Sequence, residues 1–474
     1  MRLAIVGAGS TRLPLMLASV AEAGSGTGAG AGAGTGAGSS LSEVVLFDVR
    51  PERIAALLPI AKALASECGP LPAISVAASA DEAFEGVDAA IFTIRPGFEE
   101  ARARDERACL EAGVLGQETT GAAGLAFATR SIPAVLAYCR LAESRSPGFL
   151  PVVFTNPAGM VAQALADEGF ERAVGICDSA TVAAKAIALR AGVAFENVTF
   201  EVHGLNHLSW TGRVTAAGRD LMPGAMQDES LLNELVPWWV RETPAMGRIP
   251  NEYLYYWYRT ADAVAALKAE HQTRGEALVA TNRNMLNDVG ALCAAERVSD
   301  GLVRYAAYLS GRNSSYMEYA RGEHVRGAAP SAMSPADAIA FLKTQTGGYA
   351  EVAMELLAGR TGTNPCRMAL NVQNRGALPG LDEGDVVEVD CTVDGDGVRP
   401  NPHGALPPDD LKLMTRVKAY EHLAVKAIRE GSQRLAIEAL VAHPLVDHRQ
   451  TAEHLAAVLA IDLGQAPARG RRAT

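Results

Sequence analysis

The sequence predicts an α/β protein. It opens with a Rossmann-like, doubly wound parallel sheet and continues into a mixed α+β domain. Short apolar runs alternate with helical patterns through the first part of the chain, and this alternation is typical of a parallel sheet covered by helices on both faces. The chain has 474 residues, which is too long for one ordinary core. We therefore expect two domains, residues 1–180 and 181–465.

Several short apolar segments of the first domain are expected to be strands of that sheet. They are residues 3–6, 44–47, 73–77, 89–94, 151–155 and 173–177. A helical pattern over residues 11–23 follows the first of them. Residues 24–40 are nearly all Gly, Ala, Ser and Thr. Because such a segment cannot bury apolar surface, we expect a mobile loop inserted into this domain.

The pattern changes after about residue 180 to that of a mixed domain. Residues 198–203 and 386–393 alternate in polarity like half-exposed strands. Long helical patterns are expected at residues 254–269, 334–357 and 409–463. The last residues, from 464 onward, resemble a frayed tail.

Composition and charge limit the possible partners. Hydrophobic residues make up 49% and charged residues 20% of the chain, which is a globular composition. The net charge of −11 argues against nucleic acid or an anionic membrane as a partner. The seven cysteines form no CxxC pair, which indicates reduced thiols and a cytoplasmic location. Since no apolar run of 18 residues is uninterrupted, no membrane span is expected.

The segment Gly7-Ala8-Gly9-Ser10 follows the first expected strand and precedes a helical pattern. This arrangement indicates a dinucleotide-binding turn, with Ser10 as part of the cofactor site. Gly7 permits the sharp turn, and Gly9 lets the backbone approach a pyrophosphate at the helix N-terminus. Arg12 replaces the third glycine of the full fingerprint, so an ordinary tight turn remains the alternative.

Asp48, at the end of the second expected strand, is the candidate acceptor for the ribose hydroxyls. It lies 39 residues after Gly9, and removal of the 17-residue loop leaves 22, close to the usual spacing of about 20. The Asp48 carboxylate repels a 2′-phosphate, which favours NAD over NADP. Arg50, also a candidate cofactor contact, weakens that preference.

Three polar motifs lie after strands or within apolar sequence. Arg95 lies in TIRPG, Glu118 in GQETTG and Asn156 in FTNPAG. Lactate and malate dehydrogenases carry a similar Asn-Pro at the same point of their sheet, so we expect an organisation like theirs. Because ligands bind outside the carboxyl ends of parallel strands, Arg95, Asn156 and Cys177 are expected at one site. Taken singly, each motif could also be a helix cap or a turn.

Cys177 in GICD and His207 in GLNH lie 30 residues apart. A thiolate and an imidazole could share a metal whose other positions are filled by substrate oxygens. A buried cysteine on a strand is common, however, so a packing role remains the more frequent explanation of this spacing.

These motifs, in this order, resemble glycoside hydrolase family 4, and the 6-phospho-β-glucosidases of that family most of all. The likeness covers most of the chain. It is carried by IVGAGS, FDVRPERI, TIRPGFEEARARDE, GVLGQETTGAAGLAFATRSIP, FTNPAG, GICD, GLNHLSW, IPNEYLYYWYR, TRGE, GGYAEVA and NRGALPGLDEGDVVEV.

The resemblance implies a role for each motif residue. The family binds a divalent metal, usually manganese, through the residues that match Cys177 and His207. Glu118 and Asn156 are expected to contact the sugar, and Asn206 of GLNH is expected in the same substrate site.

The phosphate contacts and the catalytic group follow from the same resemblance. Arg95 and Arg274 are implied phosphate contacts, since guanidiniums hold phosphate by charged, bidentate bonds. A solvated helix arginine is the alternative for Arg274. Tyr253, the first of four tyrosines in IPNEYLYYWYR, is the implied base, and Asp178 joins it in the catalytic group.

The implied chemistry is a redox-assisted elimination, an exception to the two-carboxylate scheme of most glycosidases. NAD accepts hydride from C3 of the sugar, the tyrosine removes the C2 proton, and the aglycone leaves from C1. Water then adds, and the ketone is reduced again. The implied substrate is a small phosphorylated disaccharide or glucoside, and we expect a homodimer or homotetramer.

Other functions remain possible from the sequence. Asp178 occurs in α-type family members, where β-type members more often have Asn, so 6-phospho-α-glucosidase or a non-phosphorylated α-glycosidase is the first alternative. A 2-hydroxyacid dehydrogenase on the same fold would need a His/Asp acid–base pair that no motif supplies. A non-catalytic dinucleotide sensor would not need both Cys177 and His207.

Overall fold

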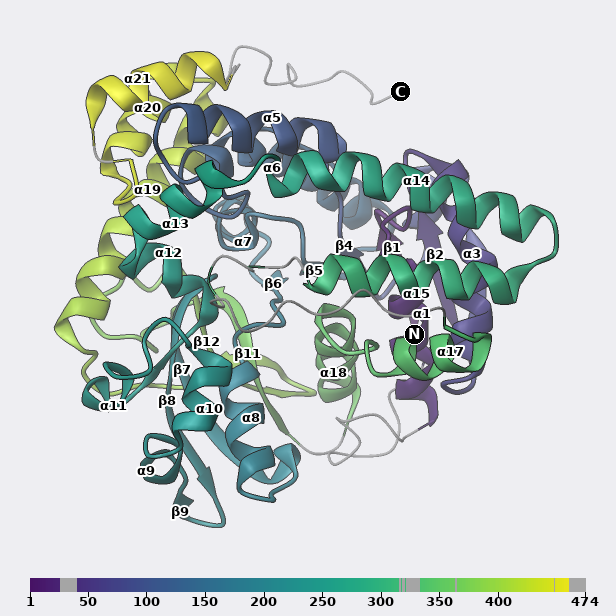
Figure 1. The fold of residues 1–474 in the computed structure, drawn as a ribbon, viewed down its shortest axis with the longest axis horizontal. Coiled ribbons are helices and arrows are strands. Elements are labelled where there is room, and N and C mark those ends of the chain that lie inside the picture. Colours follow the sequence, from purple (N-terminus) through teal and green to yellow (C-terminus); the bar gives the residue numbers. More distant parts are fainter. Residues whose placement is uncertain are drawn as a thin grey trace.

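The computed structural model shows an α/β protein built around one large sheet (Figure 1). The structure describes residues 1–25, 41–314, 317, 320, 333–362, 365–446 and 448–459. Most of the glycine-rich segment predicted as a mobile loop, from residue 26 on, lies outside these ranges, as does the C-terminal tail. Gly24 and Ser25 form the end of helix α1 (Leu13–Ser25).

Six parallel strands form the N-terminal part of the sheet in the order β3-β2-β1-β4-β5-β6. They are β1 (Arg2–Val6), β2 (Glu43–Phe47), β3 (Ala73–Val76), β4 (Ala89–Phe92), β5 (Leu150–Val153) and β6 (Val174–Gly175). All six were predicted, with ends that differ by a few residues. The strand order reverses between β1 and β4, which is the switch point where ligands bind in sheets of this kind. The predicted Rossmann-like fold is confirmed.

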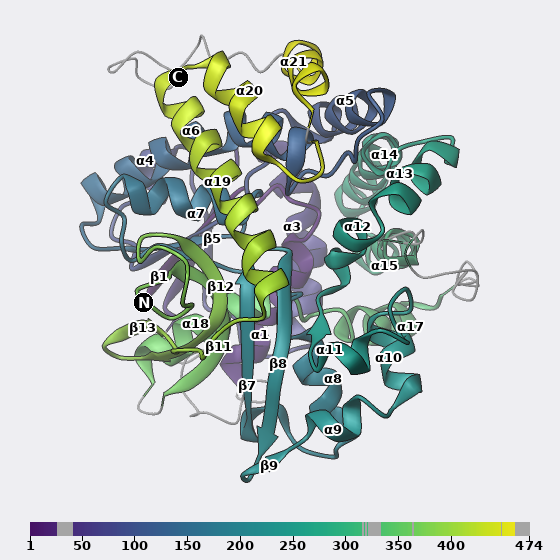
Figure 2. The ribbon, with the colours of Figure 1, turned by 90° about the vertical axis from the view of Figure 1, so that its left-hand side faces the viewer.

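The large sheet does not stop at the expected domain boundary near residue 180. Three antiparallel strands from the C-terminal half extend it, because β11 pairs with β6, β12 with β11 and β13 with β12. These are β11 (Cys366–Gln373), β12 (Val386–Asp394) and β13 (Gly397–Pro400). A second, antiparallel sheet holds the rest, namely β7 (Val198–Leu205), β8 (Leu208–Ala216), β9 (Arg219–Asp220) and β10 (Ile249–Pro250). Figure 2 shows the β7–β8 hairpin at the opposite end of the molecule from α20 and α21.

Helices cover both faces of the large sheet. On β1, Leu3 and Ile5 belong to one core, whereas Ala4 and Val6 belong to another, as the alternation of side chains along a strand requires. The first core packs against α1, α3 (Pro51–Ser66), α14 (Arg274–Ala294), α15 (Val298–Ser314), α17 (Pro335–Lys343) and α18 (Tyr349–Thr361). The second packs against α5 (Phe98–Glu111), α6 (Gly121–Arg145), α7 (Ala158–Asp167), α19 (Pro408–Glu430), α20 (Gln433–Ala442) and α21 (Arg449–Val458).

The remaining helices are short and lie mostly around the second sheet. They are α4 (Ala80–Ala83), α8 (Val182–Arg190), α9 (Met222–Ala225), α10 (Glu229–Leu235), α11 (Thr243–Met246), α12 (Tyr255–Tyr258) and α13 (Thr260–Ala269), with the 3-10 turns η1 (Phe195–Asn197) and η2 (Glu252–Leu254).

The three long helices expected in the C-terminal half are each broken. The pattern over 334–357 divides into α17 and α18, and the residue before α18 is Gly348, whose φ of +84° is outside the helical region. The pattern over 254–269 divides at Arg259, with φ −128°. The last pattern divides into three helices, first at Gly431, with φ +64°. The helical pattern predicted helices in these ranges but did not reveal where the backbone turns.

Helix α6 is the one helix of the described chain that is long and apolar enough to cross a membrane, and 61% of its most apolar window is buried in the protein. Its side chains pack in the second core. The apolar surface of α6 is therefore the surface of a core helix.

Candidate functional site

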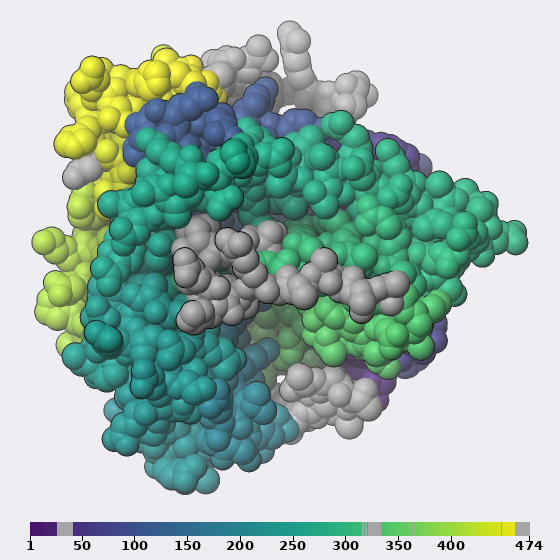
Figure 3. Space-filling model, in the orientation of Figure 1, coloured from purple at the N-terminus to yellow at the C-terminus, as the bar shows by residue number. Residues whose placement is uncertain are grey.

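A cavity of about 970 Å³ opens at the carboxyl ends of the parallel strands. Residues that directly follow β1, β4, β5 and β6 line it, as do residues of α5, α14 and η2. Of the predicted site residues, all except Gly9 and Arg50 are part of its wall. Figure 3 shows this face of the molecule hollowed between the teal segments and the green helices. The cavity therefore lies at the sheet edge where the motifs predicted a site.

The turn after β1 fits closely against the end of β4. The backbone N–H groups of Gly7 and Ala8 both donate to the Phe47 carbonyl, at 2.9 and 3.0 Å. Gly7 has φ +94°, and a Cβ there would lie 2.4 Å from the Thr93 carbonyl oxygen. Gly7 therefore makes the turn for the two reasons that the fingerprint requires, backbone conformation and close approach.

Gly9 makes a contact that the sequence did not predict. Its N–H donates to Oδ2 of Asp48 at 2.8 Å, and a Cβ on Gly9 would lie 2.8 Å from the same carboxyl group. Oδ1 of Asp48 accepts from the Arg50 N–H at 2.8 Å. Gly9 thus makes room for the Asp48 side chain, and this carboxylate links the β1 and β2 turns while still lining the cavity.

Arg50 is outside the cavity wall. Its guanidinium carbon lies 3.5 Å from the centre of the Phe98 ring, which is a cation–π contact. Arg53, which was not predicted, lines the cavity in its place and forms an ion pair with Glu99 at 3.2 Å. The Arg50 guanidinium thus stacks on Phe98, which itself lines the cavity, and a cofactor contact by Arg50 stays a prediction.

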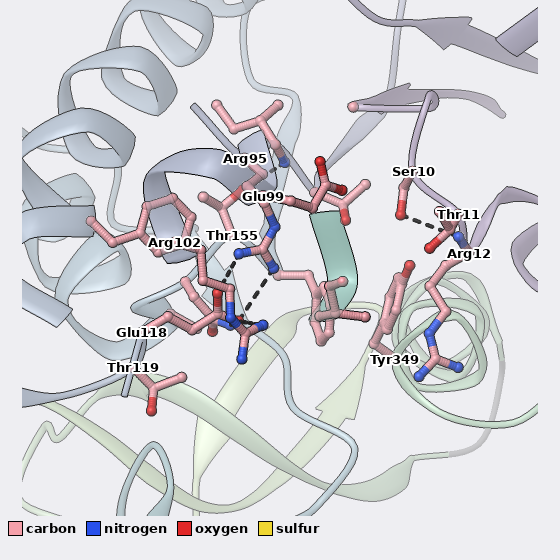
Figure 4. A pocket seen from close by; sticks show the side chains of 18 of the residues that line it. Ser10, Thr11, Arg12, Arg95, Glu99, Arg102, Glu118, Thr119, Thr155 and Tyr349 are labelled. Atoms are coloured by element: carbon pink, nitrogen blue, oxygen red, sulfur yellow. Dashed lines mark hydrogen bonds and ion pairs between the residues drawn. The ribbon is translucent and has the colours of Figure 1, made fainter. Parts of the chain in front are cut away.

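Glu118 is the centre of an ion-pair cluster (Figure 4). Arg95 binds it through both terminal nitrogens, Arg102 approaches Oε1 at 3.2 Å, and Asn156 donates to Oε1 at 3.3 Å. Burial alone would raise the pKa of Glu118, but Arg102 and Arg95 outweigh it and hold the pKa well below its usual range. Glu118 is therefore an anion throughout the physiological pH range. The side chains expected to contact phosphate and sugar are here bonded to one another.

Arg274, at the start of α14, lies on the other side of this cluster. Its Nη2 donates to the Arg312 carbonyl at 3.4 Å. Burial lowers the pKa of Arg274 to about 10, and the nearby positive charges of Arg102 and Arg312 act in the same direction. Three guanidiniums thus concentrate positive charge along one part of the cavity wall, where a small anion would be attracted.

Cys177 lies two residues beyond β6 and is 5% exposed. Its Sγ is 3.1 Å from the Ser179 hydroxyl, which accepts from Nδ2 of Asn251 at 3.1 Å. Burial raises the pKa of the thiol well above its usual value, and the charges of Glu388 and Asp178 raise it further. A bound cation would reverse this balance and favour the thiolate.

His207 is held by the turn of the β7–β8 hairpin. Asn206 and His207 are the two residues between the paired positions Leu205 and Leu208, and His207 takes φ +61°. Its Nδ1 is buried without a hydrogen-bond partner in the described part of the chain. Burial lowers the pKa of His207 to about 4, so the imidazole is neutral at pH 7, as a metal ligand must be.

Tyr253 lies directly on His207. The two ring centroids are 3.8 Å apart and the ring planes meet at 19°. The Tyr253 N–H donates to Oδ1 of Asn251 at 3.1 Å, and the Asn251 N–H donates to the Ser209 carbonyl at 2.9 Å. The short turn η2 is therefore fixed to strand β8, and Tyr253 is placed beside the imidazole at the cavity wall.

The remaining three predicted residues, Ser10, Asp178 and Asn206, also line the cavity. Asp178 faces Gly348, where a Cβ would lie 3.1 Å from its Oδ2. Asn206 donates from Nδ2 to Oε1 of Glu388 at 3.2 Å, so its amide is held by a group behind the wall.

The donor set fits a divalent cation bound jointly by protein and ligand. Cys177 and His207 offer one sulfur and one nitrogen, and the partnerless Nδ1 of His207 shows that the imidazole is not committed to another group. Within the described residues no group of three or more His, Cys, Asp and Glu side chains is placed to hold a metal. A metal at this thiol and imidazole would therefore need oxygen ligands from substrate or water.

Sequence reasoning missed several residues of the wall. Arg102 and Glu106 are one helical turn apart on α5 and are joined at 2.6 Å; such a pair predicts an exposed helix face. They line the cavity because α14 crosses α5 there. Tyr349 of α18 lines it too, stacked on Phe154 with centroids 3.6 Å apart, and in Figure 4 it lies beside Ser10 and Arg12. Nothing in the local sequence predicted that contact.

Fold and site together define a Rossmann-type enzyme whose cavity joins a glycine turn, an arginine cluster and a thiol–imidazole pair. A family model described as Family 4 glycosyl hydrolase matches residues 2–192, and the model of the Family 4 glycosyl hydrolase C-terminal domain matches residues 202–446. The chain belongs to glycosyl hydrolase family 4, as its motifs indicated.

Curated relatives of both anomeric types are similar to this chain. A phospho-alpha-glucosidase of Clostridium acetobutylicum is 26% identical over 95% of each chain. A 6-phospho-beta-glucosidase of Thermotoga maritima is 24% identical over 94% of each. Among solved structures, the 6-phospho-beta glucosidase from Thermotoga maritima with manganese, NAD+ and glucose-6-phosphate matches with a TM-score of 0.77 and 22% identity over 97% of each chain. These similarities do not separate the two anomeric types.

Proposed function

We propose that this enzyme hydrolyses 6-phosphoglucosides with the help of NAD and a divalent cation, for which manganese is the candidate. The solved Thermotoga maritima structure holds manganese, NAD+ and glucose-6-phosphate, and a 6-phospho-alpha-glucosidase from gut microorganisms was solved with NAD and Mn2+. In the present chain, one observation supports the proposal most directly. The Tyr253–His207 stack and the arginine cluster line one cavity, and Glu118 lies within electrostatic reach of both His207 and Arg274.

The arginine cluster supports a phosphorylated substrate. Glu118 binds Arg95 and Arg102, and Arg102 and Arg312 lie close enough to Arg274 to lower its pKa. A phosphate dianion placed among these guanidiniums would relieve their mutual repulsion and accept several charge-assisted hydrogen bonds. We therefore assign the phosphate subsite to the part of the wall around Arg274.

The other residues have roles that suit an elimination at the sugar ring. NAD at the Gly7 turn would supply reversible oxidation at C3 of the sugar, and the cation would polarise the neighbouring oxygens. Cys177 and His207 would hold the cation, and Tyr253 would take the proton from C2. Because its ring lies against His207, the tyrosine needs no rearrangement to meet a sugar bound there.

For the anomer we propose the β configuration, on the motifs IPNEYLYYWYR and GDVVEVDCTV. Asp178 favours a second candidate, the α-linked substrate. It is a carboxyl group in the cavity wall beside Cys177, where α-type members carry Asp, and it could donate a proton to a departing α-linked oxygen.

An assay with paired nitrophenyl glucosides tests the proposal. The α and β compounds, each with and without a 6-phosphate, are given to enzyme supplied with NAD+, Mn2+ and a reductant. We expect release from the β-6-phosphate compound that depends on NAD+ without net accumulation of NADH. Full activity after removal of nucleotide would rule out the redox route, and equal rates without the phosphate would rule out the phosphate subsite. The Asp178→Asn variant should retain β activity; loss of α activity in this variant would establish the second candidate.

A further inference from the structure

Behind the thiol and the imidazole lies a carboxylate that none of the roles above uses. Glu388, on β12, is 0% exposed and does not line the cavity. Its Oε2 accepts from the Ser209 hydroxyl at 2.8 Å, and its Oε1 accepts from Asn371 at 3.1 Å and Asn206 at 3.2 Å. All three donors are neutral. Within the described residues no lysine, arginine or histidine side chain pairs with it.

Each of the three donors lies beside, or is bonded or paired to, a segment that carries a site residue. Asn206 directly precedes His207 in the hairpin turn. Ser209 accepts, through its carbonyl, the N–H of Asn251, the residue that caps the turn holding Tyr253. Hydrogen bonds thus connect Glu388 both to the hairpin turn that carries His207 and, through Ser209, to the η2 turn that carries Tyr253.

The third donor, Asn371, connects Glu388 to the segment that carries Cys177. Asn371 on β11 is the register partner both of Glu388 on β12 and of Gly175 on β6. A Cβ on Gly175 would lie 2.8 Å from the Cβ of Asn371, so the strands meet here without space for a larger residue. Cys177 follows Gly175 by two residues, and the negative charge of Glu388 helps to raise the pKa of its thiol.

A fully buried carboxylate held only by neutral donors is costly in free energy, because its charge has lost water without gaining an opposite charge. A divalent cation at Cys177 and His207 would provide that opposite charge. Carboxylates behind metal ligands commonly orient them and strengthen binding, and their removal typically lowers metal affinity by about 10- to 100-fold. Burial also raises the pKa of Glu388 although its three donors oppose this.

We infer that Glu388 is the outer-shell positioning residue of the metal centre: it orients the Asn206–His207 turn and the Asn371–Gly175 register, and its charge offsets that of the bound cation. The inference rests on the metal site proposed above. It makes Glu388 a positioning residue that acts through Asn206, Ser209 and Asn371, without contact to substrate. The inference also accounts for the contact of the β7–β8 hairpin turn and strand β11 with the buried carboxylate of Glu388 on β12.

Calorimetric titration with Mn2+ alone, without substrate, tests this assignment. Glu388→Gln keeps the shape of the side chain and removes the charge, so we expect the dissociation constant for Mn2+ to rise by about 10- to 100-fold. Glu388→Asp keeps the charge and should lose less affinity than the glutamine variant. Glu355→Gln is the matched control. Glu355 is a carboxyl on α18, away from the cavity wall, whose pKa burial raises to about 7, and its loss should leave Mn2+ affinity unchanged.

Thermal unfolding without metal gives a readout that a packing role would not produce. If Glu388 carries an uncompensated charge, metal-free Glu388→Gln should melt at least as high as metal-free wild type, and Mn2+ should raise its melting temperature by less. A glutamine variant that binds Mn2+ like wild type, or that fails to fold, overturns the inference while leaving the metal site intact. Wild-type protein that binds no Mn2+ overturns the proposed metal site itself.

Discussion

The ring of Tyr253 stacks on the imidazole of His207, with centroids 3.8 Å apart and planes at 19°. The two residues lie 46 positions apart in the chain and come from different elements, the η2 turn and the β7–β8 hairpin. In the proposed mechanism, this contact places the candidate metal ligand beside the candidate base. The cation and the group that removes a proton would then act on adjacent atoms of one substrate, as deprotonation next to a polarised oxygen requires.

The first prediction concerns that tyrosine. Tyr253→Phe keeps the stack and removes the hydroxyl, so kcat should fall by about 10² to 10⁴, the range for loss of a general base, while Mn2+ affinity should stay nearly unchanged. Tyr255→Phe, in the same motif but outside the cavity wall, should retain activity. Solvent deuterium should appear at C2 of the product made by wild-type enzyme. Retention of the original C2 hydrogen together with full activity of Tyr253→Phe would exclude the elimination route.

The second prediction concerns the metal ligands. Cys177→Ser and His207→Ala should each reduce Mn2+-dependent turnover to background, because each removes one of the two side chains proposed to bind the cation. Circular dichroism should show a retained fold. Cys68→Ser provides the control, since Cys68 is outside the cavity wall. Near-wild-type activity of either ligand variant at low Mn2+ would show that the cation binds elsewhere.

The third prediction concerns the phosphate subsite. Arg274→Gln should raise KM for a 6-phosphoglucoside by about 10- to 100-fold, equivalent to one charge-assisted hydrogen bond of roughly 1.5–3 kcal/mol. KM for any residual activity on the unphosphorylated glucoside should change little. Arg283→Gln is the control on the same helix, because the Arg283 side chain is 63% exposed and pairs with Glu100 at the surface. An equal change for both substrates would mean that Arg274 acts on folding or on the cofactor.

The fourth prediction concerns acid stability. Burial lowers the pKa of His207 to about 4 and that of His443 to about 3, whereas both are near 6.5 in the unfolded chain. The unfolded state therefore binds more protons below pH 6.5. The contribution of these histidines to the free energy of unfolding should be constant above that pH and fall by about 1.4 kcal/mol per pH unit for each histidine as the pH decreases toward these folded values.

Urea titrations at pH 7, 6 and 5 measure this slope. His443 bonds to the Thr120 hydroxyl at 2.8 Å and accepts from the Leu445 N–H at 3.1 Å, away from the predicted ligands. His443→Gln should remove one histidine's contribution to the slope. A wild-type slope equal to that of His443→Gln would show that His443 is not held neutral by the fold.

Much of the fold was predictable because its signals are local. Each parallel strand was found from a short apolar run, and the Rossmann turn from Gly7 and its neighbours. The sequence could not show that β11 to β13 extend the same sheet, since strand pairing depends on partners hundreds of residues apart. Nor could it show the break before α18, because Gly348 lies in a segment whose apolar pattern continues on both sides.

The site was predictable residue by residue but not as a set of contacts. Motifs identified Arg95, Glu118 and Asn156 separately, whereas the structure shows that they bond to one another. Gly9 and Asp48 were both identified, but the hydrogen bond between them, which is a second reason for glycine at position 9, was not. Arg50 was predicted from its place beside Asp48, but its stacking on Phe98 was not.

By itself, the sequence determined which chemical groups the protein has and which strands place them at one edge of a sheet, because strand ends, glycine turns and motif order are properties of consecutive residues. Only the tertiary structure decided how those groups meet. Burial of Glu118 between two arginines, the stack of Tyr253 on His207 and the convergence of three segments on Glu388 all join residues from distant parts of the chain. Whether a charged side chain is solvated or buried depends on what packs over it, and that is fixed only when the whole chain has folded.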